Sequence, residues 1–532
     1  MNLFKQKINP ERLKEIIKNG GIVPEEKEDL YKLLINNDIS DEHENEIKFL
    51  VWKLIKKRND LFDVELLSKL LNISELNVKK IFKSIPIEVK FPIALDDKGE
   101  LATAYIIPLS KPSDRLTFSS NKETQEALKT IQKILKNKNY EIQNFFVIFD
   151  KNFSDKSFML SIAAGLLLPK ENIQNFAFTG VVNEEGEVFD VGYIPEKEKA
   201  AKKENLKLIS PDILDTIDEL VYWLGSEPVD IPFIYSIKRP EEEPISALNK
   251  IEKKIKENKP YFSIEGLENI FGIKKEDLFF NYDNWLPVLE EEQVNEENEW
   301  IKQVENFEEK LRNIYSKIDS KNRVLHLAFA VPVSLAMGLG IKLGAKKPVI
   351  IYHYQSDEYL PVIDLSDVRK LRRIKYIRKD IKNQLKNIEV DIPEKIKNNE
   401  DVAAAIWLAS HSPYGDTQNY LKSNEKDWDL IKIESQDFQG DITLPYEDIK
   451  EDYWIRYVSE MYSVLNILKN DYQIQRYHFF LSVPVPIAFA LGMAIGHFWE
   501  GYIYNYNFKS SDEKNKYYPV FNMKDDRLKS IF

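Results

Sequence analysis

An internal repeat in the last third of the chain constrains the fold more than any other feature of the sequence. Residues 326–354 and 478–506 align without a gap at a shift of 152 residues, and 11 of the 29 aligned positions are identical. The identical pairs include His326/His478, Pro332/Pro484, Ala336/Ala488, Gly340/Gly492 and Gly344/Gly496. Each copy has the apolar run of a buried strand, a proline that begins a helix, and a second strand. The sequence therefore predicts two similar units, about 323–365 and 475–523, in a C-terminal domain over 300–532.

The repeat also bears on whether the chain spans a membrane. The second copy has no Asp, Glu, Lys or Arg from Tyr477 to Trp499, a length that could cross a bilayer. The equivalent helix of the first copy contains Lys342, and each copy changes from strand to helix at a proline, which a single spanning helix would not do. We expect no membrane span. The N-terminus has no apolar signal-peptide core, which indicates a cytoplasmic protein.

Composition excludes several kinds of site. The chain has no cysteine, so disulfides, thiolate nucleophiles and cysteine zinc sites are excluded. Its six histidines show no spacing typical of metal ligands, and we expect no metal. The net charge of −12 argues against a protein that coats nucleic acid.

Two similar strand–helix units can form a ligand cleft where their strands end. Ligands of open α/β sheets bind beyond the carboxyl ends of the strands, and nearby helix N-termini attract phosphate. Polar and aromatic residues at these predicted ends favour a pocket for bases and phosphates. The candidate ligand-binding residues are Pro332, Ser334, Trp407, Ser410, His411, Ser412, Tyr414 and Pro484. A duplicated scaffold without a ligand remains the alternative.

The repeat resembles a known sensor domain. Both copies contain VP-x₃-A-x₃-G followed by a YxY strand, and DEYLPVIDL and KYYPVFNM come after them. Over about 300–525 this pattern resembles the SAVED domain. The resemblance implies two fused CARF-like, Rossmann-like halves that sense cyclic oligonucleotides during antiphage defence.

The middle of the chain resembles a second family. Strand-like and helical patterns alternate over 86–238 and predict an α+β domain. Without cysteine, a serine paired with a lysine is a possible catalytic pair. Ser154 precedes Thr179 by 25 residues and Lys197 by 43, which is the spacing of the Lon protease domain. The resemblance implies that Ser154 is the nucleophile, Lys197 the general base and Thr179 a residue that orients the lysine.

The chain departs from Lon in several respects. NFSDK stands where Lon usually has GPSAG, which puts the oxyanion hole in doubt. Ser157 and Ser161 compete with Ser154, and Lys199 competes with Lys197. There is no GxxxxGK[ST] motif, so we expect proteolysis without ATP. A degenerate Lon fold that only binds is the alternative.

Three further segments have predicted roles. Residues 1–85 read as short helices, and Asp63–Ile85 is typical either of a helix–turn–helix or of generic helical packing. Residues 239–299 are charged and helical, as in a solvated linker. The basic run Arg369–Lys379 is a solvated face, a phosphate-binding edge or a contact between sensor domains.

Together these patterns predict a multi-domain α/β protein: an N-terminal helical region, a Lon-like α+β domain and a C-terminal SAVED domain. The order resembles the CRISPR-associated Lon-SAVED proteases (the CalpL family) of type III systems. That resemblance implies activation by cyclic oligoadenylate, with the tetra-adenylate (cA4) as the expected ring. It also implies an anti-sigma-factor-like protein substrate, ligand-induced homo-oligomers and no cofactor. A non-catalytic adaptor and a helix–turn–helix transcription regulator remain the alternatives.

Overall fold

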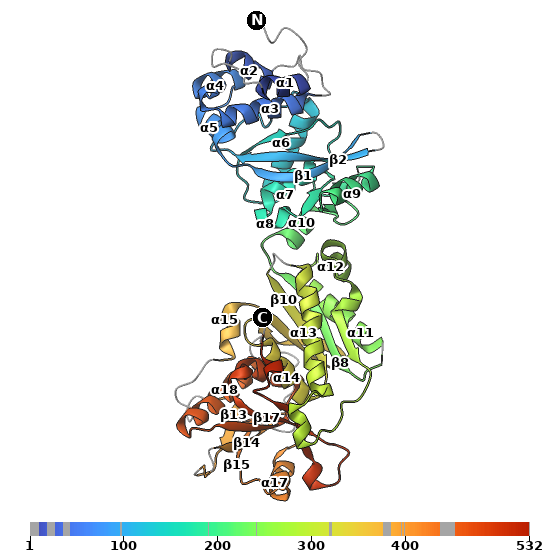
Figure 1. Cartoon of the computed structure of the whole chain (residues 1–532), viewed down its shortest axis with the longest axis vertical. Helices are drawn as coiled ribbons and strands as arrows, with labels where there is room; N and C mark the ends of the chain where they lie inside the picture. The colour runs from blue at the N-terminus through green and yellow to red at the C-terminus, as the bar shows by residue number, and fades with distance from the viewer. Residues whose placement is uncertain are drawn as a thin grey trace. The chain divides into compact units, whose positions relative to one another are not determined.

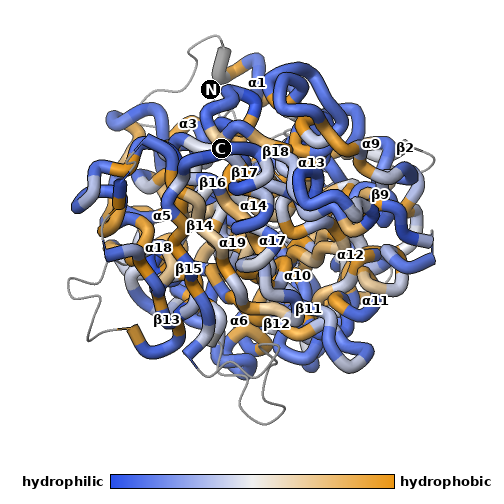
Figure 2. Tube along the Cα trace, turned by 90° about the horizontal axis from the view of Figure 1, so that it is seen from below, coloured by the Kyte–Doolittle hydropathy of each residue, from blue (hydrophilic) through white to orange (hydrophobic). Residues whose placement is uncertain are grey.

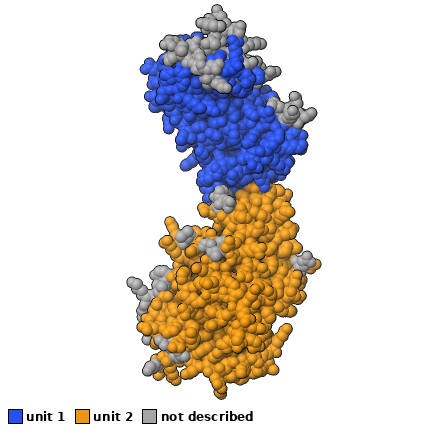
Figure 3. Space-filling view, in the orientation of Figure 1, with its two compact units in different colours: residues 1–227 blue, residues 228–532 orange. Residues whose placement is uncertain are grey.

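The chain folds into two compact units, residues 1–227 and residues 228–532 (Figure 3). The structure is a computed structural model. It describes residues 10–18, 27–35, 43–95, 98–189, 191–240, 242–318, 322–375, 385–394, 396–397, 400–436 and 453–530. The boundary between the units lies at 227/228 and not at the expected 238/239.

Five α-helices among the described residues open the N-terminal unit, in agreement with the predicted short helices. They are α1 (Pro10–Lys18), α2 (Lys27–Ile35), α3 (Glu44–Lys57), α4 (Val64–Leu71) and α5 (Glu75–Lys83). The side chains of Asp63 and Ser74 cap the N-termini of α4 and α5. Asn72, in the left-handed conformation, ends α4. Lys79, Lys80 and Lys83 are exposed on α5.

These helices do not form a domain of their own, as had been expected for 1–85. Their buried side chains share one core with Ile107, Phe118, Phe146 and Ile148 of the following segment. That segment contains a mixed five-stranded sheet in the order β3-β2-β1-β4-β7, in which β1, β2 and β3 are antiparallel and β1, β4 and β7 are parallel. In Figure 1, α1–α5 gather on one side of β1 and β2 and α7, α8 and α10 on the other.

The elements of this α+β segment follow the expected alternation. They are β1 (Ile87–Leu95), β2 (Lys98–Pro108), α6 (Lys122–Asn137), β3 (Phe145–Phe149), α7 (Met159–Leu167), α8 (Lys170–Ile173), β4 (Phe176–Phe178), β5 (Val181–Val182), β6 (Val188–Phe189), α9 (Ile194–Lys203), β7 (Lys207–Ile209) and α10 (Ile217–Leu224).

The C-terminal unit contains two sheets of matching design. The first has the order β12-β11-β10-β8-β9 and the second β13-β15-β14-β16-β17-β18. In each sheet four neighbouring strands are parallel and the edge strand β12 or β18 is antiparallel. The two predicted Rossmann-like halves are therefore present.

The first half is built from β8 (Val229–Ile237), α11 (Glu242–Lys256), α12 (Ile264–Phe271), β9 (Phe279–Tyr282), α13 (Glu299–Lys317), β10 (Arg323–Ala330), α14 (Val333–Leu343), β11 (Val349–Gln355) and β12 (Glu358–Leu365). The second is built from β13 (Ile388–Asp391), β14 (Asp401–Trp407), α17 (Tyr414–Ser423), β15 (Asp429–Ser435), α18 (Tyr453–Asp471), β16 (Arg476–Ser482), α19 (Val485–Ile495), β17 (Glu500–Tyr506) and β18 (Tyr517–Asn522), with α15 (Val368–Arg373) between the halves.

The predicted linker over 239–299 is wrong, because strands on both sides of α11 and α12 belong to the first sheet. Every residue of β8 is buried, and β9 pairs with it in parallel. The structural repeat thus includes β8 and β14, which the sequence comparison missed. Asp230 on β8 and Asp401 on β14 are equivalent but 171 residues apart, so a fixed shift of 152 cannot align them.

The two halves meet where helices α14 and α19 cross in close contact. Both helices are labelled near the centre of the view in Figure 2. Both helices are buried. A Cβ atom on Gly340 would overlap the carbonyl oxygen of Phe489, and one on Gly492 would overlap that of Met337. The two repeated glycines therefore let the helix backbones touch reciprocally, and no larger residue fits at either position.

This crossing gives a stability prediction. Alanine normally stabilises a helix relative to glycine by about 1 kcal/mol. At Gly340 and Gly492 we expect the opposite sign, because the added methyl group overlaps backbone: Gly340→Ala or Gly492→Ala should destabilise the C-terminal unit by about 1–3 kcal/mol. Gly415→Ala, at an exposed position of α17 with nothing within 4 Å of the added Cβ, is the control. Thermal denaturation measures the effect, and a Gly340→Ala variant as stable as the wild type would contradict the crossing.

Candidate functional site

Each half of the C-terminal unit contains a buried aspartate–histidine–tyrosine connection. In the first half, His326 Nε2 lies 2.8 Å from Asp230 Oδ1 and Nδ1 lies 2.8 Å from the Tyr352 hydroxyl. In the second half, His478 Nε2 lies 2.8 Å from Asp401 Oδ1 and Nδ1 lies 3.2 Å from the Tyr504 hydroxyl. Each connection ties together three adjacent parallel strands. The histidines stand within their strands rather than at the carboxyl ends, so we assign them to the framework.

Burial decides the charge of His478. It lowers the pKa of this imidazole to about 4, although the hydrogen bond to Asp401 opposes the shift. His478 is therefore neutral at pH 7, with Nε2–H donating to Asp401 and Nδ1 accepting from Tyr504. Trp428 stacks on the ring at a centroid distance of 3.6 Å.

The predicted prolines stand where the strands of the repeat give way to helices. Pro332 joins β10 to α14, and Pro484 joins β16 to α19. Ser334, on the first turn of α14, is buried and donates a hydrogen bond of 2.7 Å to Asn505 Oδ1 on β17 of the other half. Asn505 in turn donates to the hydroxyl of Tyr518. Ser334 therefore connects the halves, through a partner that the sequence did not single out.

The remaining predicted ligand residues gather where β14 ends. Leu408 N donates to Ser482 O over 2.7 Å, which places Trp407 beside the turn before Pro484. Tyr414 meets Trp407 edge-on, with ring centroids 5.7 Å apart. Ser410 and His411 are exposed and Ser412 is half-buried.

His411 extends this group toward β17. Its Nε2 atom lies 3.0 Å from Asp416 Oδ2, and its ring lies 5.0 Å from that of Tyr506. Tyr506 was missed as a site residue, although it is one of the tyrosines in the repeated YxY motif. Three aromatic residues and a histidine thus line the carboxyl ends of β14 and β17.

In the N-terminal unit, the predicted base Lys197 is fully buried on α9. Its Nζ atom lies 3.7 Å from Asp155 Oδ2 and donates to Val191 O over 3.4 Å. Asp155 also accepts a hydrogen bond from the backbone N–H of Ser157. The competing Lys199 is exposed.

The serines differ sharply in their surroundings. Ser154 is exposed, whereas Ser157 and Thr179 are fully buried. The hydroxyls of Ser157 and Thr179 have no hydrogen-bond partner among the described residues, and Gly180 N donates to Ser157 O over 2.9 Å. Ser161 donates to Phe158 O within α7. The structure thus connects Lys197 to Ser157 through Asp155 and places Thr179 next to Gly180, which bonds to Ser157. Ser154 lies at the surface.

The basic run is partly described. Arg369, Arg372 and Arg373 are exposed on α15, and Lys370 pairs with Asp364. The Nζ atom of Lys375 lies 5.9 Å from the ring centroid of Phe498. Arg378 and Lys379 lie outside the described residues. The described part of α15 is a solvated face.

The described residues contain neither a metal-binding cluster nor a helix suited to crossing a membrane. No group of three or more His, Asp or Glu residues in that part of the chain could hold a metal ion. No helix within it combines the length and apolar character that crossing a membrane requires.

Comparison with known proteins identifies the repeat. Residues 300–365 and 375–523 match the family model "SAVED: SMODS-associated and fused to various effectors sensor domain". The C-terminal unit contains a SAVED domain. The matched residues lie within the range predicted for this domain, 300–532. Strands β8 and β9, which precede the matched residues, complete the first sheet.

Solved structures similar to the chain include the Cap4 SAVED/CARF-domain containing receptor of Acinetobacter baumannii. Its complex with the cyclic trinucleotide 2′3′3′-cAAA is 11% identical, covers 84% of this chain and 96% of that chain, and gives a TM-score of 0.36. The receptor alone and its complex with 3′3′3′-cAAA give TM-scores of 0.27 and 0.30 at 10% and 13% identity. Each covers 55% of this chain, which spans about half of their length (49%). Among the curated proteins, none matches.

The buried His478 of the SAVED domain predicts a pH-dependent stability. Its folded pKa of about 4 lies below the ordinary 6.5, so unfolding takes up a proton between these values. The stabilisation is complete above pH 6.5 and is lost as the pH falls toward 4. We expect a loss of about 2–3 kcal/mol of unfolding free energy between pH 7 and 4.5.

Urea denaturation of full-length protein measures this loss. His478→Gln cannot titrate and should remove most of the pH dependence in this window, whereas His411→Gln, at an exposed position, should keep it. An unchanged pH dependence in His478→Gln would show that other groups are responsible.

Proposed function

We propose that this chain is a serine protease whose activity is controlled by cyclic oligoadenylate bound to its SAVED domain. One observation carries the proposal: Lys197 is fully buried, and Asp155, whose carboxylate lies 3.7 Å from Lys197 Nζ, also accepts a hydrogen bond from the backbone N–H of Ser157. The hydroxyl of Ser157 is itself buried and has no partner among the described residues. A serine–lysine hydrolase needs a lysine shielded from water that can become neutral and take a proton from a hydroxyl. The spacing that resembles Lon lies over the same segment.

Two serines compete for the role of nucleophile. The register with Lon selects Ser154, which is exposed. Burial, the unpartnered hydroxyl and the position two residues before α7 favour Ser157. In either case Lys197 takes the hydroxyl proton as the serine oxygen attacks the peptide carbonyl, and it gives that proton to the leaving amine as the C–N bond breaks. Water, deprotonated by Lys197, then attacks the acyl ester, and the proton returns to the serine oxygen as the carboxylic acid leaves.

Asp155 bears on how the protease is switched. A carboxylate 3.7 Å from Nζ favours the charged ammonium over the neutral amine that a general base requires. Activation would then include a movement that separates Asp155 from Lys197. A ligand can drive such a movement only if it binds the active arrangement more tightly.

For the sensor, the aromatic group at the ends of β14 and β17 suits a cyclic oligoadenylate. Trp407, Tyr414 and Tyr506 offer ring faces for adenine bases, and the N-terminus of α19 behind Pro484 favours phosphate. We expect the tetra-adenylate (cA4) as ligand.

The exposed arginines of α15 are the proposed contact through which ligand-bound SAVED domains assemble into a homo-oligomer. In this proposal the substrate is an anti-sigma-factor-like protein of a type III CRISPR system, cleaved in the cytoplasm without ATP, cofactor or metal.

Substitution of the candidate dyad tests the proteolysis. Lys197→Met and Ser157→Ala should abolish cleavage of the partner protein in the presence of cA4, because they remove the base and the buried nucleophile. Ser161→Ala is the matched control and should retain activity, since Ser161 bonds only to its own helix. Gel analysis of the cleaved partner is the measurement. Full activity in Ser157→Ala with loss of activity in Ser154→Ala would identify Ser154 as the nucleophile. Full activity in Lys197→Met would reject the serine–lysine pair.

The ligand site has a separate test. Trp407→Ala or His411→Ala should weaken binding of cA4 by about 5- to 150-fold, as expected for loss of one stacking contact worth about 1–3 kcal/mol. Trp285→Ala is the control, since Trp285 is 72% exposed and follows β9 of the first sheet rather than β14 or β17. Titration calorimetry measures the affinities. Unchanged affinity in both site variants would show that cA4 binds at a different site.

A further inference from the structure

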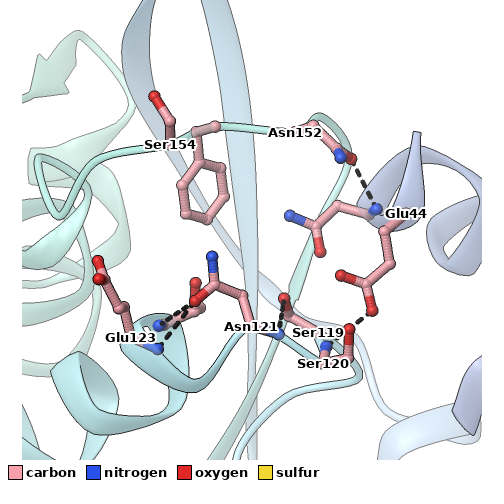
Figure 4. Close-up of a pocket in the computed structure, with 10 residues that line it drawn as sticks. Glu44, Ser119, Ser120, Asn121, Glu123, Asn152 and Ser154 are labelled. Carbon is pink, nitrogen blue, oxygen red and sulfur yellow. Dashed lines mark hydrogen bonds between the residues drawn. The ribbon is translucent and has the colours of Figure 1, made fainter. Parts of the chain in front are cut away.

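A polar pocket of about 670 Å³ opens in the N-terminal unit beside Ser154 (Figure 4). Three segments form it: the start of α3, the turn into α6, and the loop that follows β3. It adjoins the loop that carries Ser154 and Asp155. Ser154 lines the pocket, and the next residue, Asp155, holds its carboxylate 3.7 Å from Lys197 Nζ.

The starts of two helices supply hydrogen-bond donors to this pocket. No side chain caps α3, and the backbone N–H of Asn45 in its first turn donates 2.7 Å to Asn152 Oδ1. At α6, Asn121 Oδ1 accepts from the backbone N–H groups of Glu123 and Thr124. Figure 4 shows the amide nitrogen of Asn121 turned away from these bonds and toward the segment that carries Ser154.

Asn45 is the feature that points to a ligand. Its side chain lines the pocket, the residue is only 7% exposed, and no hydrogen bond joins its amide to the described residues. The Asn45 amide is not among the fully buried atoms that lack a partner, so water in the pocket can reach it. A polar group that enters the pocket can displace this water and bond to the amide in its place.

Charge narrows the chemistry of that group. Glu44 is ionised: the ammonium of Lys48 and the N–H of Ser120 hold its pKa down against the effect of burial. The second lining carboxylate, Glu123, is exposed, and the lining includes no Lys, Arg or His. An anionic group is therefore disfavoured, and an apolar group would leave Asn45 without a partner.

We propose that this pocket binds an uncharged amide or hydroxyl side chain of the peptide substrate, close to the scissile bond. The inference rests on the proposed protease function and names its substrate class: peptides with Asn, Gln, Ser or Thr at one fixed position near the cleaved bond.

The test uses full-length protein with cA4 and a library of octapeptides that vary one position at a time among Asn, Gln, Ser, Leu, Asp and Lys. Wild type should favour Asn, Gln or Ser at one position. Asn45→Leu, of similar volume, should shift the ratio of kcat/KM for Asn over Leu there by about tenfold or more. Asn137→Leu, the same change at the exposed far end of α6, is the control. Lys197→Met, which cannot cleave, is used to capture the same peptides.

The outcomes distinguish failure of the pocket proposal from failure of the protease proposal. A preference that Asn45→Leu leaves unchanged overturns the pocket, even if cleavage is robust. Capture by Lys197→Met that favours amide peptides and is lost when Asn45→Leu is added supports the pocket. If such capture is seen while wild type cleaves nothing, the protease proposal fails and the pocket stands. Neither cleavage nor selective capture overturns both.

Discussion

The reciprocal contact of α14 and α19 is the constraint on which the C-terminal unit depends. Gly340 and Gly492 bring two buried helices to backbone contact, and that contact sets how closely the two halves approach. The hydrogen bond from Ser334 to Asn505 joins the halves at the strand ends. Because the helices begin at Pro332 and Pro484, the same crossing fixes both helix N-termini with respect to the ends of β14 and β17.

Much of this arrangement could be predicted from the sequence because the repeat is ungapped through one strand, one helix and a second strand. The strands β8 and β14 could not be found in the same way. The insertions that separate them from β10 and β16 differ in length, so Asp230 and Asp401 fall 171 residues apart while His326 and His478 fall 152 apart. Charged helices α11 and α12 then looked like a linker, although their apolar faces are buried.

At the candidate catalytic site, sequence spacing alone could not identify the nucleophile. Spacing located the loop before α7 and the buried lysine of α9, but it could not distinguish Ser154 from Ser157, since three residues separate an exposed hydroxyl from a buried one. Asp155 and Asn45 also escaped notice. Asp155 was missed because its closeness to Lys197 appears only in the fold. Asn45 was missed because the pocket that it lines is built from segments far apart in sequence.

Hydrogen–deuterium exchange of the full-length protein, with and without cA4, tests most directly whether the sensor controls the protease. We expect slower exchange around Trp407–Tyr414 and Pro484, together with altered exchange in the segments that carry Asp155 and Lys197. Protection at the strand ends with no change around Asp155 and Lys197 would contradict control of the protease by the SAVED domain. No protection anywhere in the SAVED domain would contradict the proposal that this domain binds cA4.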